Sequence, residues 1–554
     1  MYTLNYVYVN ESDLINFIYK NNLQNQKNLL IQVFSGKVEK TFLENLKNLI
    51  KKHLPQAKII GTTTDGEIID CKVLQEEVVI SFSVFEKTTI RTMLLEKYDI
   101  SSEKLGEIIN ENINDKTKVA IIFADGLTTN GERLIKKINK NVKISGGFAG
   151  DNYNLVQTFV FTDEGLTDLG CAVAFLDSDE LIVYNDYSLN WEGIGKILTV
   201  TKADNNGVVY ELDGVPVKDI YKKYFGYLAD EYLLEIGMEF PLITVRNGIK
   251  IARAVVNDGE NYLVYAGNLY EGEEVQFGYA SINDILNQDI EMFKKLANKP
   301  VESLFIYECT ARKKFFNNRI EYEYMPVSDI EMSGFYTYGE FFGNKERYFF
   351  NQTITYLALS ENSDKRINIK ETILYDKDDF LVCQVLTNLI KSTSLDLKYT
   401  TERLKVVAST DNLTEILNRK GCFEEISKLN CNYTMLLIDI DHFKEINDKY
   451  GHSVGDKVLK GLVDLIKVNI RDNDIFCRFG GEEFIIILPG VNKSTAVRIA
   501  EKIKDLVNRT FIYGMKITIS IGIAEHTDGF ESTFKKADEN LYKAKKEGRN
   551  RVCF

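Results

Sequence analysis

One seven-residue segment constrains this 554-residue chain more than any other: Arg478-Phe479-Gly480-Gly481-Glu482-Glu483-Phe484. An apolar run follows at 484–488, and residues 474–477 are typical of an incoming strand, so the two glycines are predicted at a tight hairpin turn. Glycine permits a positive φ there and lets a bulky ligand approach the backbone closely. Two adjacent carboxylates at such a turn suit a divalent metal ion, which in turn suits a nucleoside triphosphate.

A second acidic group lies at the end of a short apolar strand, Thr434-Met435-Leu436-Leu437-Ile438, which runs into Asp439-Ile440-Asp441. Strand alternation places the two aspartates on one face and the isoleucine on the other. Beside the hairpin, Asp439 with Glu482 or Glu483 would form a hard, oxygen-rich site for Mg²⁺ or Mn²⁺. Asp441 is left outside this predicted primary site.

Each of these segments alone is explained better by an ordinary turn or helix cap than by a functional site. Together, over residues 411–550, they resemble GGDEF-domain diguanylate cyclases, in the variant whose signature is GGEEF. The resemblance rests, in order, on DNLTEILNR, DIDHFKEIND, GHSVGD, RFGGEEF, SIGIA and ADENLYKAKKEGRN. It implies a C-terminal domain built on a nucleotidyl-cyclase or polymerase-palm-like (ferredoxin-like) sheet flanked by helices.

The resemblance also implies roles for individual residues. Asp439, Glu482 and Glu483 would be catalytic and, with the Ile440 carbonyl, would bind the metal. The implied substrate-binding residues are Phe443, Lys444, Asn447, Asp456, Gly480, Gly481, Lys545 and Arg549. Among these, Asn447 and Asp456 match the pair that binds the guanine edge, and the basic residues match those that hold the triphosphate. Whether Glu483 binds metal or activates the attacking 3′-hydroxyl stays open.

The implied reaction condenses two GTP molecules into cyclic di-GMP and releases two pyrophosphates, with Mg²⁺ or Mn²⁺ as cofactor. Each domain would hold one GTP, so a homodimer is required. An Arg-x-x-Asp pattern at Arg471 and Asp474 matches the family's allosteric site, at which cyclic di-GMP acts as inhibitor. The alternatives are a non-catalytic receptor for GTP or cyclic di-GMP and a mixed purine product, against which Asp456 argues.

Two positions depart from the family pattern. Glu482 stands where the name-giving motif has aspartate, which keeps the charge. Glu415 stands where the family usually has glycine. If the loop needs a positive φ there, glutamate would strain it by roughly 1 kcal/mol.

The remaining chain has the composition of a cytoplasmic globular protein. No run reaches the ~18 apolar residues that span a bilayer, and the N-terminus lacks a signal peptide's basic start, so we expect no membrane partner. Eight cysteines without a CxxC pair predict reduced thiols. Residues 411–554 carry 23 Lys/Arg and 22 Asp/Glu, out of 68 and 81 in the whole chain. The other 410 residues therefore carry 45 Lys/Arg and 59 Asp/Glu, a net charge of −14. This acidity argues against nucleic acid as a partner.

The N-terminal part alternates predicted strands and helices. Buried strands are expected at 28–34, 78–85 and 119–124, with helices at 40–54 and 131–138. Glycine-rich turns follow strands at 60–67 and 144–152, where ligand clefts often form.

With YELDGVPV, YAGNL, CTAR and GFYTYGE further along, these segments resemble the N- and C-terminal halves of FIST sensory domains. The resemblance implies that a small metabolite, such as an amino acid, binds there. Arg312 would contact a carboxylate and Glu340 an ammonium group, although a structural salt bridge explains both residues equally well.

We therefore predict an α/β and α+β multidomain chain. Its parts are a FIST N-terminal domain (1–205), a FIST C-terminal domain (206–375), a signalling helix (376–409) and a GGDEF domain (410–554). Two heptad series run along the helix: Cys383, Ile390, Leu397, Leu404 and Leu386, Thr393, Thr400, Val407. Threonines at two core positions predict a weak coiled coil, which ligand binding could re-register; an amphipathic helix packed on its own sensor is the alternative.

Overall fold

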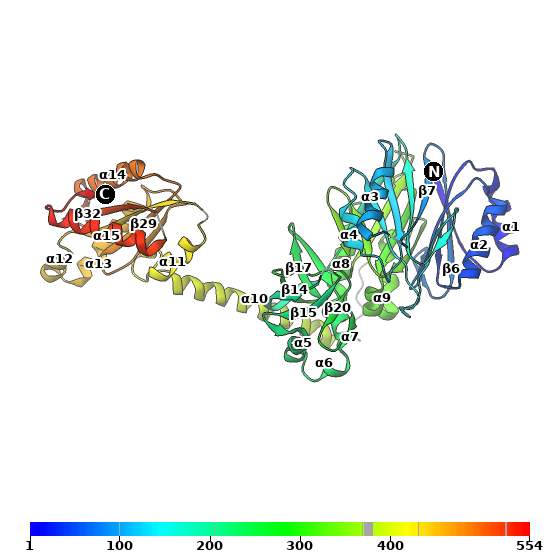
Figure 1. The fold of residues 1–554 in the computed structure, drawn as a ribbon, viewed down its shortest axis with the longest axis horizontal. Coiled ribbons are helices and arrows are strands. Elements are labelled where there is room, and N and C mark those ends of the chain that lie inside the picture. Colours follow the sequence, from blue (N-terminus) through cyan, green and yellow to red (C-terminus); the bar gives the residue numbers. More distant parts are fainter. Residues whose placement is uncertain (99, 205, 368, 371–380, 430, 527–528) are drawn as a thin grey trace. The chain divides into compact units, whose positions relative to one another are not determined.

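The computed structural model describes residues 1–554 except 99, 205, 368, 371–380, 430 and 527–528. The chain divides into two compact units, Met1–Leu389 and Ile390–Phe554. Figure 1 shows sheets and helices in both, which confirms the predicted mixed α and β multidomain class.

Three six-stranded sheets form the framework of the N-terminal unit. The first contains, in spatial order, β1 (Tyr2–Val7), β6 (Val78–Phe85), β2 (Asn28–Ser35), β3 (Lys58–Thr63), β10 (Val160–Thr162) and β11 (Leu166–Thr167). The second contains β25 (Arg347–Phe350), β24 (Glu340–Gly343), β9 (Lys143–Phe148), β8 (Thr117–Ala124), β12 (Gly170–Asp177) and β7 (Thr89–Glu96). The third contains β13 (Ile182–Ser188), β26 (Ile354–Ser360), β22 (Ser303–Cys309), β23 (Met332–Thr337), β4 (Glu67–Ile69) and β5 (Lys72–Leu74).

Strands from both sides of the boundary predicted at 205/206 share these sheets. β23 pairs with β4, β24 pairs with β9, and β13 pairs with β26. The sheets also share one core, in which Phe34 of β2, Phe123 of β8 and Phe335 of β23 make mutual ring contacts. The two predicted sensor halves therefore interlock within one unit.

Helices cover the outer faces of these sheets as the apolar periodicity requires. On the first sheet lie α1 (Glu11–Lys20), η1 (Leu23–Asn25) and α2 (Lys40–His53). The second sheet is covered by α3 (Ser102–Asn112) and α4 (Gly131–Lys136). The third sheet is covered by α8 (Ile282–Lys294), α9 (Thr310–Phe316) and η2 (Asn317–Val327). In α2, for example, Leu43, Leu46 and Ile50 share one buried face. The predicted strands at 28–34, 78–85 and 119–124 and both predicted helices are confirmed.

A fourth sheet of eight strands completes the N-terminal unit. It contains β18 (Ile249–Arg253), β17 (Leu242–Arg246), β21 (Glu274–Tyr279), β14 (Glu192–Ala203), β15 (Val208–Leu212), β20 (Leu263–Tyr265) and β19 (Val255–Asp258), with β16 (Val215–Pro216) paired to β15. Beside it lie α5 (Val217–Phe225), α6 (Leu228–Glu231) and α7 (Leu233–Glu239).

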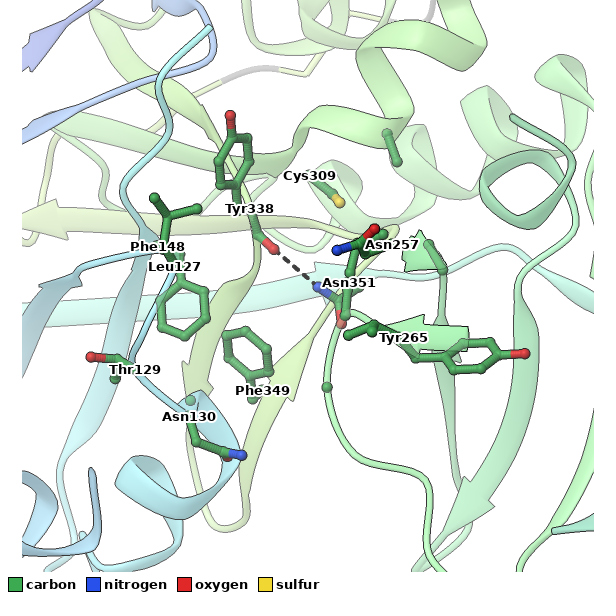
Figure 2. A pocket seen from close by; sticks show the side chains of 18 of the residues that line it. Leu127, Thr129, Asn130, Phe148, Asn257, Tyr265, Cys309, Tyr338, Phe349 and Asn351 are labelled. Atoms are coloured by element: carbon green, nitrogen blue, oxygen red, sulfur yellow. Dashed lines mark hydrogen bonds between the residues drawn. The ribbon is translucent and has the colours of Figure 1, made fainter. Parts of the chain in front are cut away.

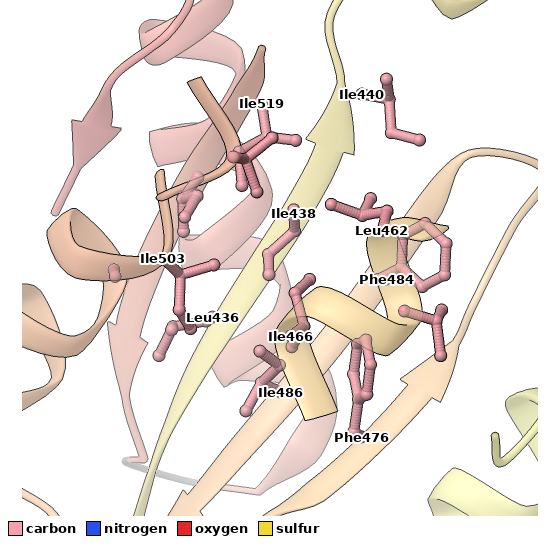
Figure 3. Close-up of a cluster of buried hydrophobic side chains, with 14 of the residues drawn as sticks. Leu436, Ile438, Ile440, Leu462, Ile466, Phe476, Phe484, Ile486, Ile503 and Ile519 are labelled. Atoms are coloured by element: carbon pink, nitrogen blue, oxygen red, sulfur yellow. The ribbon is translucent and has the colours of Figure 1, made fainter. Parts of the chain in front are cut away.

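The C-terminal unit is built on a five-stranded sheet. Its order is β28 (Ile475–Arg478), β29 (Glu483–Pro489), β27 (Tyr433–Ile440), β32 (Ile519–Glu525) and β33 (Val552–Cys553), and a separate hairpin joins β30 (Phe511–Ile512) to β31 (Met515–Lys516). Even-numbered residues of β27, including Leu436 and Ile438, pack with α13 (His452–Lys467) and α14 (Lys493–Arg509) (Figure 3). Odd-numbered residues face α11 (Arg419–Ser427) and α15 (Phe530–Lys546). This alternation decides which helix can reach the acidic end of β27.

A long helix, α10 (Leu381–Ser409), precedes the five-stranded sheet in the sequence and confirms the described part of the helix predicted at 376–409. Residues 376–380 of that prediction lie outside the described residues. Of the two heptad series, Leu397, Leu404 and Val407 are more than half exposed and Ile390 is about one-third exposed. The side chains of Cys383, Leu386 and Thr393 lie outside the described residues. No helix in the described part of the chain has the length and apolar character needed to cross a bilayer.

Candidate functional site

Strand register brings the predicted acidic residues together in the C-terminal unit. β27 and β29 are antiparallel, and Asp439 lies directly opposite Glu483. Both are odd-numbered residues on the face that α15 covers. The neighbouring Glu482 belongs to the hairpin, and its carbonyl oxygen accepts a hydrogen bond from the Ile440 amide at 3.4 Å. The Ile440 side chain points instead into the core on the opposite face, as predicted.

The hairpin glycines do not have the positive φ that the sequence suggested. Close approach explains Gly480 instead, because a Cβ there would lie 2.6 Å from Glu483 Oε2. A Cβ on Gly481 would meet nothing within 4 Å, so that residue leaves open space at the tip. The turn is closed by the Glu483 carbonyl oxygen, which accepts from the amides of Phe479 and Gly480.

Burial and mutual repulsion make these carboxylates unusual. Asp439 is 6% exposed, and burial raises its pKa despite an ion pair in which Lys545 Nζ of α15 lies 2.7 Å from its Oδ2. Burial, followed by the negative charge of Asp439, also raises the pKa of Glu483. Lys545 thus pairs with one of two carboxylates, Asp439 and Glu483, that repel each other, and a further cation would relieve this repulsion.

The donor set fits a hard divalent cation. Carboxylates and the Ile440 carbonyl supply only oxygen, which Mg²⁺ and Mn²⁺ prefer. Among the described residues no three Asp, Glu, His or Cys side chains gather into a complete metal site.

Two residues hold this arrangement in place and were not predicted to do so. Asp441 is buried and accepts from Thr518 Oγ1, Ser520 Oγ and the Asn550 amide at 2.7–3.0 Å, which ties β27 to β32 and to the segment after α15. Arg478 joins the Gly481 carbonyl, at 2.7 Å, to the Asp411 carboxylate, at 3.1 Å. Both lie inside the motifs DIDHFKEIND and RFGGEEF, which was the available signal.

Two neighbouring helices bring together the predicted guanine-binding residues. Asn447 lies on α12 (Phe443–Tyr450) and the exposed Asp456 on α13. Between them, Gly455 lets the helices approach, because a Cβ there would lie 1.9 Å from Asn447 Oδ1 and 3.2 Å from the Phe443 ring. Lys444 is exposed on α12, and the exposed Arg549 follows α15, close enough for its charge to act on Asp439.

The Arg-x-x-Asp pattern forms a turn before β28. Asp474 accepts from the Arg471 amide at 2.8 Å, and its own amide donates to the Arg471 carbonyl at 3.0 Å. The Arg471 side chain is exposed.

Glu415 has the positive φ that its position suggested, at 58°. We expect Glu415→Gly to raise the free energy of unfolding by about 1 kcal/mol, since glycine removes the left-handed strain, and its larger unfolded-state entropy offsets part of the gain. Urea denaturation followed by far-ultraviolet circular dichroism would measure it. Lys428→Gly, at a helix end with a negative φ, is the control and should not be stabilising.

The two predicted sensor contacts are sealed inside the N-terminal unit. Arg312 is fully buried and pairs with Asp289 at 2.7 Å, with Glu308 at 3.1 Å and with Glu323. Glu340 is fully buried as well, and neither of its carboxylate oxygens has a hydrogen-bond partner among the described residues. Burial, reinforced by Glu308, raises its pKa well above the ordinary value.

A cavity of about 590 Å³ lies elsewhere in the same unit, and neither Arg312 nor Glu340 lines it (Figure 2). Its walls come from 126–132, 148–155, 254–268, 309–311 and 338–351. The predicted turn at 144–152 contributes Phe148, whereas the turn at 60–67 contributes nothing. The segments YAGNL, CTAR and GFYTYGE, which carry the FIST resemblance, also contribute lining residues, although the sequence singled out Arg312 and Glu340 within them instead. The other lining residues come from distant segments without a local motif.

Comparison with known proteins matches three separate ranges of the chain to three domain families. The family described as diguanylate cyclase, GGDEF domain, matches residues 408–551, the FIST N domain matches 29–215, and the FIST C domain matches 218–343. Diguanylate cyclase DgcM of Escherichia coli (strain K12) is 40% identical over 162 residues, which cover 27% of this chain and 39% of that protein. Response regulator PleD of Caulobacter vibrioides (strain NA1000 / CB15N) is 41% identical over 162 residues, covering 26% and 36%.

Solved structures of GGDEF domains also match part of the chain. The active GGEEF domain of a diguanylate cyclase from Vibrio cholerae is 36% identical and covers 24% of this chain and 88% of its own, with a TM-score of 0.22. The coiled coil and GGDEF domain of DgcB from Caulobacter crescentus, in complex with c-di-GMP, is 29% identical and covers 32% and 99%, with a TM-score of 0.29. The chain therefore contains a GGDEF domain at residues 408–551, preceded in the sequence by FIST N and FIST C domains, and it spans less than half the length of the two curated relatives DgcM and PleD.

Proposed function

We propose that this chain is a ligand-regulated, cytoplasmic diguanylate cyclase that condenses two GTP molecules into cyclic di-GMP as a homodimer. The observation that carries the proposal is the pairing of Asp439 with Glu483 across adjacent strands, beside Lys545 and the Gly480-Gly481 turn. A buried and a half-buried carboxylate thus lie next to a cation and open space, an arrangement that suits metal-assisted phosphoryl chemistry.

In the proposed reaction, the 3′-hydroxyl oxygen of one GTP forms a bond to the α-phosphorus of the other. The bond from that phosphorus to pyrophosphate breaks, and the hydroxyl proton leaves to a base. Glu483, which lies directly opposite Asp439, is the candidate base if the metal is held by the other groups, and a metal ligand otherwise. Lys444, Lys545 and Arg549 would hold the triphosphate, while Asn447 and Asp456 would orient the guanine.

Asp439, Glu482, Glu483 and the Ile440 carbonyl are the groups that would hold Mg²⁺ or Mn²⁺. When bound, the ion would neutralise phosphate charge and lower the pKa of the attacking hydroxyl. Lys545 would then be free to exchange its ion pair with Asp439 for one with a phosphate oxygen.

Dimerisation is part of the proposal because one domain holds one nucleotide. The exposed side chains of Leu397, Leu404 and Val407 on α10 support a helix pair between two copies. Thr400, an exposed core position of the same series, would weaken that pair, so that a ligand in the N-terminal unit could shift it.

A non-catalytic receptor for GTP or cyclic di-GMP is the second candidate. The retention of Asp439, Glu482 and Glu483 around one turn argues for the enzyme, because binding nucleotide alone does not need a repelling carboxylate pair.

The direct test is incubation of the purified full chain with GTP and Mg²⁺, followed by chromatography of the products. We expect cyclic di-GMP and pyrophosphate, and a rate per protomer that increases with protein concentration as dimers form. GTP binding without any cyclic di-GMP, at all protein concentrations, would favour the receptor.

Product inhibition at Arg471 and Asp474 is proposed separately. Added cyclic di-GMP should inhibit the parent chain, and Arg471→Ala should weaken that inhibition about tenfold or more, because the guanidinium supplies two charge-assisted hydrogen bonds. Arg498→Ala, at an exposed arginine of α14, is the matched control. An Arg471→Ala protein as sensitive to product as its parent would contradict this proposal.

A further inference from the structure

The cavity in the N-terminal unit has the size and lining of a ligand site. Its volume of about 590 Å³ lies inside the ~300–1,000 Å³ range of pockets for small molecules and cofactors. Leu127 and Leu155 are partly exposed, which places them at its mouth, whereas Phe148 and Phe349 are buried. Because its walls include Phe148 of β9, Phe349 of β25 and residues of β19 and β20, a bound molecule would contact strands of two different sheets at once.

The lining carries almost no charge. Glu132 is the only charged side chain among the described lining residues, and it is already neutralised. It accepts from Arg246 at 2.9 Å, from Arg253 and from the Tyr270 hydroxyl at 2.9 Å, while Arg246 also pairs with Glu273. Burial raises the pKa of the Cys309 thiol, which keeps that group neutral as well. A ligand with a free carboxylate or ammonium would find no opposite charge available, and burying it unpaired is costly.

Aromatic rings and amides make up much of the remaining lining. Phe148 and Phe349 form a ring pair with centroids 4.7 Å apart, and Tyr153 and Tyr338 form a second pair at 6.1 Å. Asn130, Asn257 and Asn351 lie around them (Figure 2). Ring faces favour a flat, aromatic body. The carboxamides of Asn130 and Asn351 already donate and accept hydrogen bonds within the protein, which fixes their orientation. The exposed Asn257 carboxamide, whose oxygen accepts from the Asp258 amide, can offer its amide nitrogen as a donor to the edge of a heterocycle.

One unpaired polar group and one strained segment also belong to this wall. Thr310 is 5% exposed, and its Oγ1 has no hydrogen-bond partner among the described residues. Tyr153 and Leu155 have φ values of 65° and 54°, which bulky residues rarely adopt. Asp151 accepts from the amides of Leu155 and the two residues after it and from the Tyr338 hydroxyl, which in turn accepts from the Tyr153 amide, so this network holds both residues. Strain of this kind persists where the surroundings enforce it, and it is concentrated at binding sites.

We propose that this cavity is the regulatory site of the N-terminal unit and that it binds an uncharged, flat heteroaromatic molecule of nucleoside or flavin type. The assignment deepens the proposed function and rests on it. It replaces the amino acid suggested by Arg312 and Glu340, since Arg312 is occupied by carboxylates and neither residue lines the cavity.

Calorimetric titration of the full chain with defined probes tests this proposal. The neutral aromatic probes are adenosine, thymidine and riboflavin; the charged or zwitterionic probes are L-glutamate, L-arginine and L-phenylalanine. Excess GTP with EDTA keeps the guanine site occupied and prevents turnover. We expect at least one neutral probe to bind with a submillimolar Kd and none of the amino acids to bind.

Val256→Trp would fill the cavity, and Val245→Trp is its matched control. Val256 lines the cavity at an irregular position of β19, so a larger side chain is tolerated there. Val245 is 61% exposed on β17 of the same sheet and does not line the cavity. Val256→Trp should weaken probe binding at least tenfold, and Val245→Trp should leave it unchanged.

Three results would overturn the proposal: no binding by any neutral probe, neutral-probe binding unaffected by Val256→Trp, or amino-acid binding that Val256→Trp abolishes. Heat of binding is read without cyclic di-GMP synthesis, so failure here is distinguishable from failure of the proposed enzyme activity.

Discussion

Glu483→Gln should lower the rate of cyclic di-GMP formation by about 10³-fold or more, and Asp439→Asn should do the same. Both changes remove negative charge from one register pair on adjacent strands while preserving side-chain size. The hairpin should survive, because it is closed by the backbone carbonyl of Glu483 and by Arg478, neither of which is altered. The measurement is the initial rate with GTP and Mg²⁺ at a fixed protein concentration.

The control is Asp464→Asn, which removes the same charge at an exposed position of α13. It should retain the parent rate. Unfolding curves that match among all four proteins would exclude a structural cause. A Glu483→Gln chain with more than a tenth of the parental rate would show that this carboxylate is neither base nor essential ligand.

The rate of cyclic di-GMP formation should fall as the pH of the assay is lowered, and the initial rate measured over a pH series checks this. Because burial raises the pKa of both carboxyl groups, protons compete with the metal at a higher pH than they would at exposed acids.

The sequence was sufficient to predict the acidic site because its parts are encoded locally. Asp439 ends an apolar strand and Glu483 begins one, so alternation and antiparallel pairing together place them opposite each other. Glu415 was predictable for a similar reason, since a single backbone angle decides its strain. The requirement for glycine at position 480 was predicted, but only one of its two predicted reasons is confirmed. Gly480 has no positive φ, and its small size is needed because a Cβ would clash with the Glu483 side chain.

The sensor cavity could not be predicted in this way. Leu127 follows β8, Phe349 lies on β25 of the same sheet, and Tyr265 lies on β20 of the eight-stranded sheet. They come together at the cavity only after β24 and β25 have joined the sheet of β8 and β9 and the eight-stranded sheet has packed beside it. Arg312 shows the converse difficulty. An arginine after a strand suggests a ligand contact, but whether it is sealed by three carboxylates depends on residues 289 and 323, which no spacing rule connects to it.

The stability of the N-terminal unit should decrease as pH rises from about 4 to about 8. Burial raises the pKa of Asp65 to about 7 and that of Glu67 to about 8. A carboxyl group whose pKa is higher in the folded chain holds its proton more tightly there. Its stabilising contribution is therefore complete below the unfolded pKa, near 4, and is lost as pH rises through the folded value. Each group would lose about 1.4 kcal/mol per pH unit across its window.

Asp65→Asn should remove one of these two titrations. The variant should exceed the parent in unfolding free energy by about 3 kcal/mol at pH 8 and by much less at pH 4.5, because the amide needs no proton to remain uncharged. The chain's single tryptophan, Trp191, is buried in this unit, so urea denaturation followed by its fluorescence reports this unit's unfolding. Asp115→Asn, at an exposed residue, is the control and should keep the parental pH slope. If Asp65→Asn also keeps that slope, the Asp65 carboxyl is already ionised in the folded chain at neutral pH, held by Lys313 and Lys314, whose charges oppose the effect of burial.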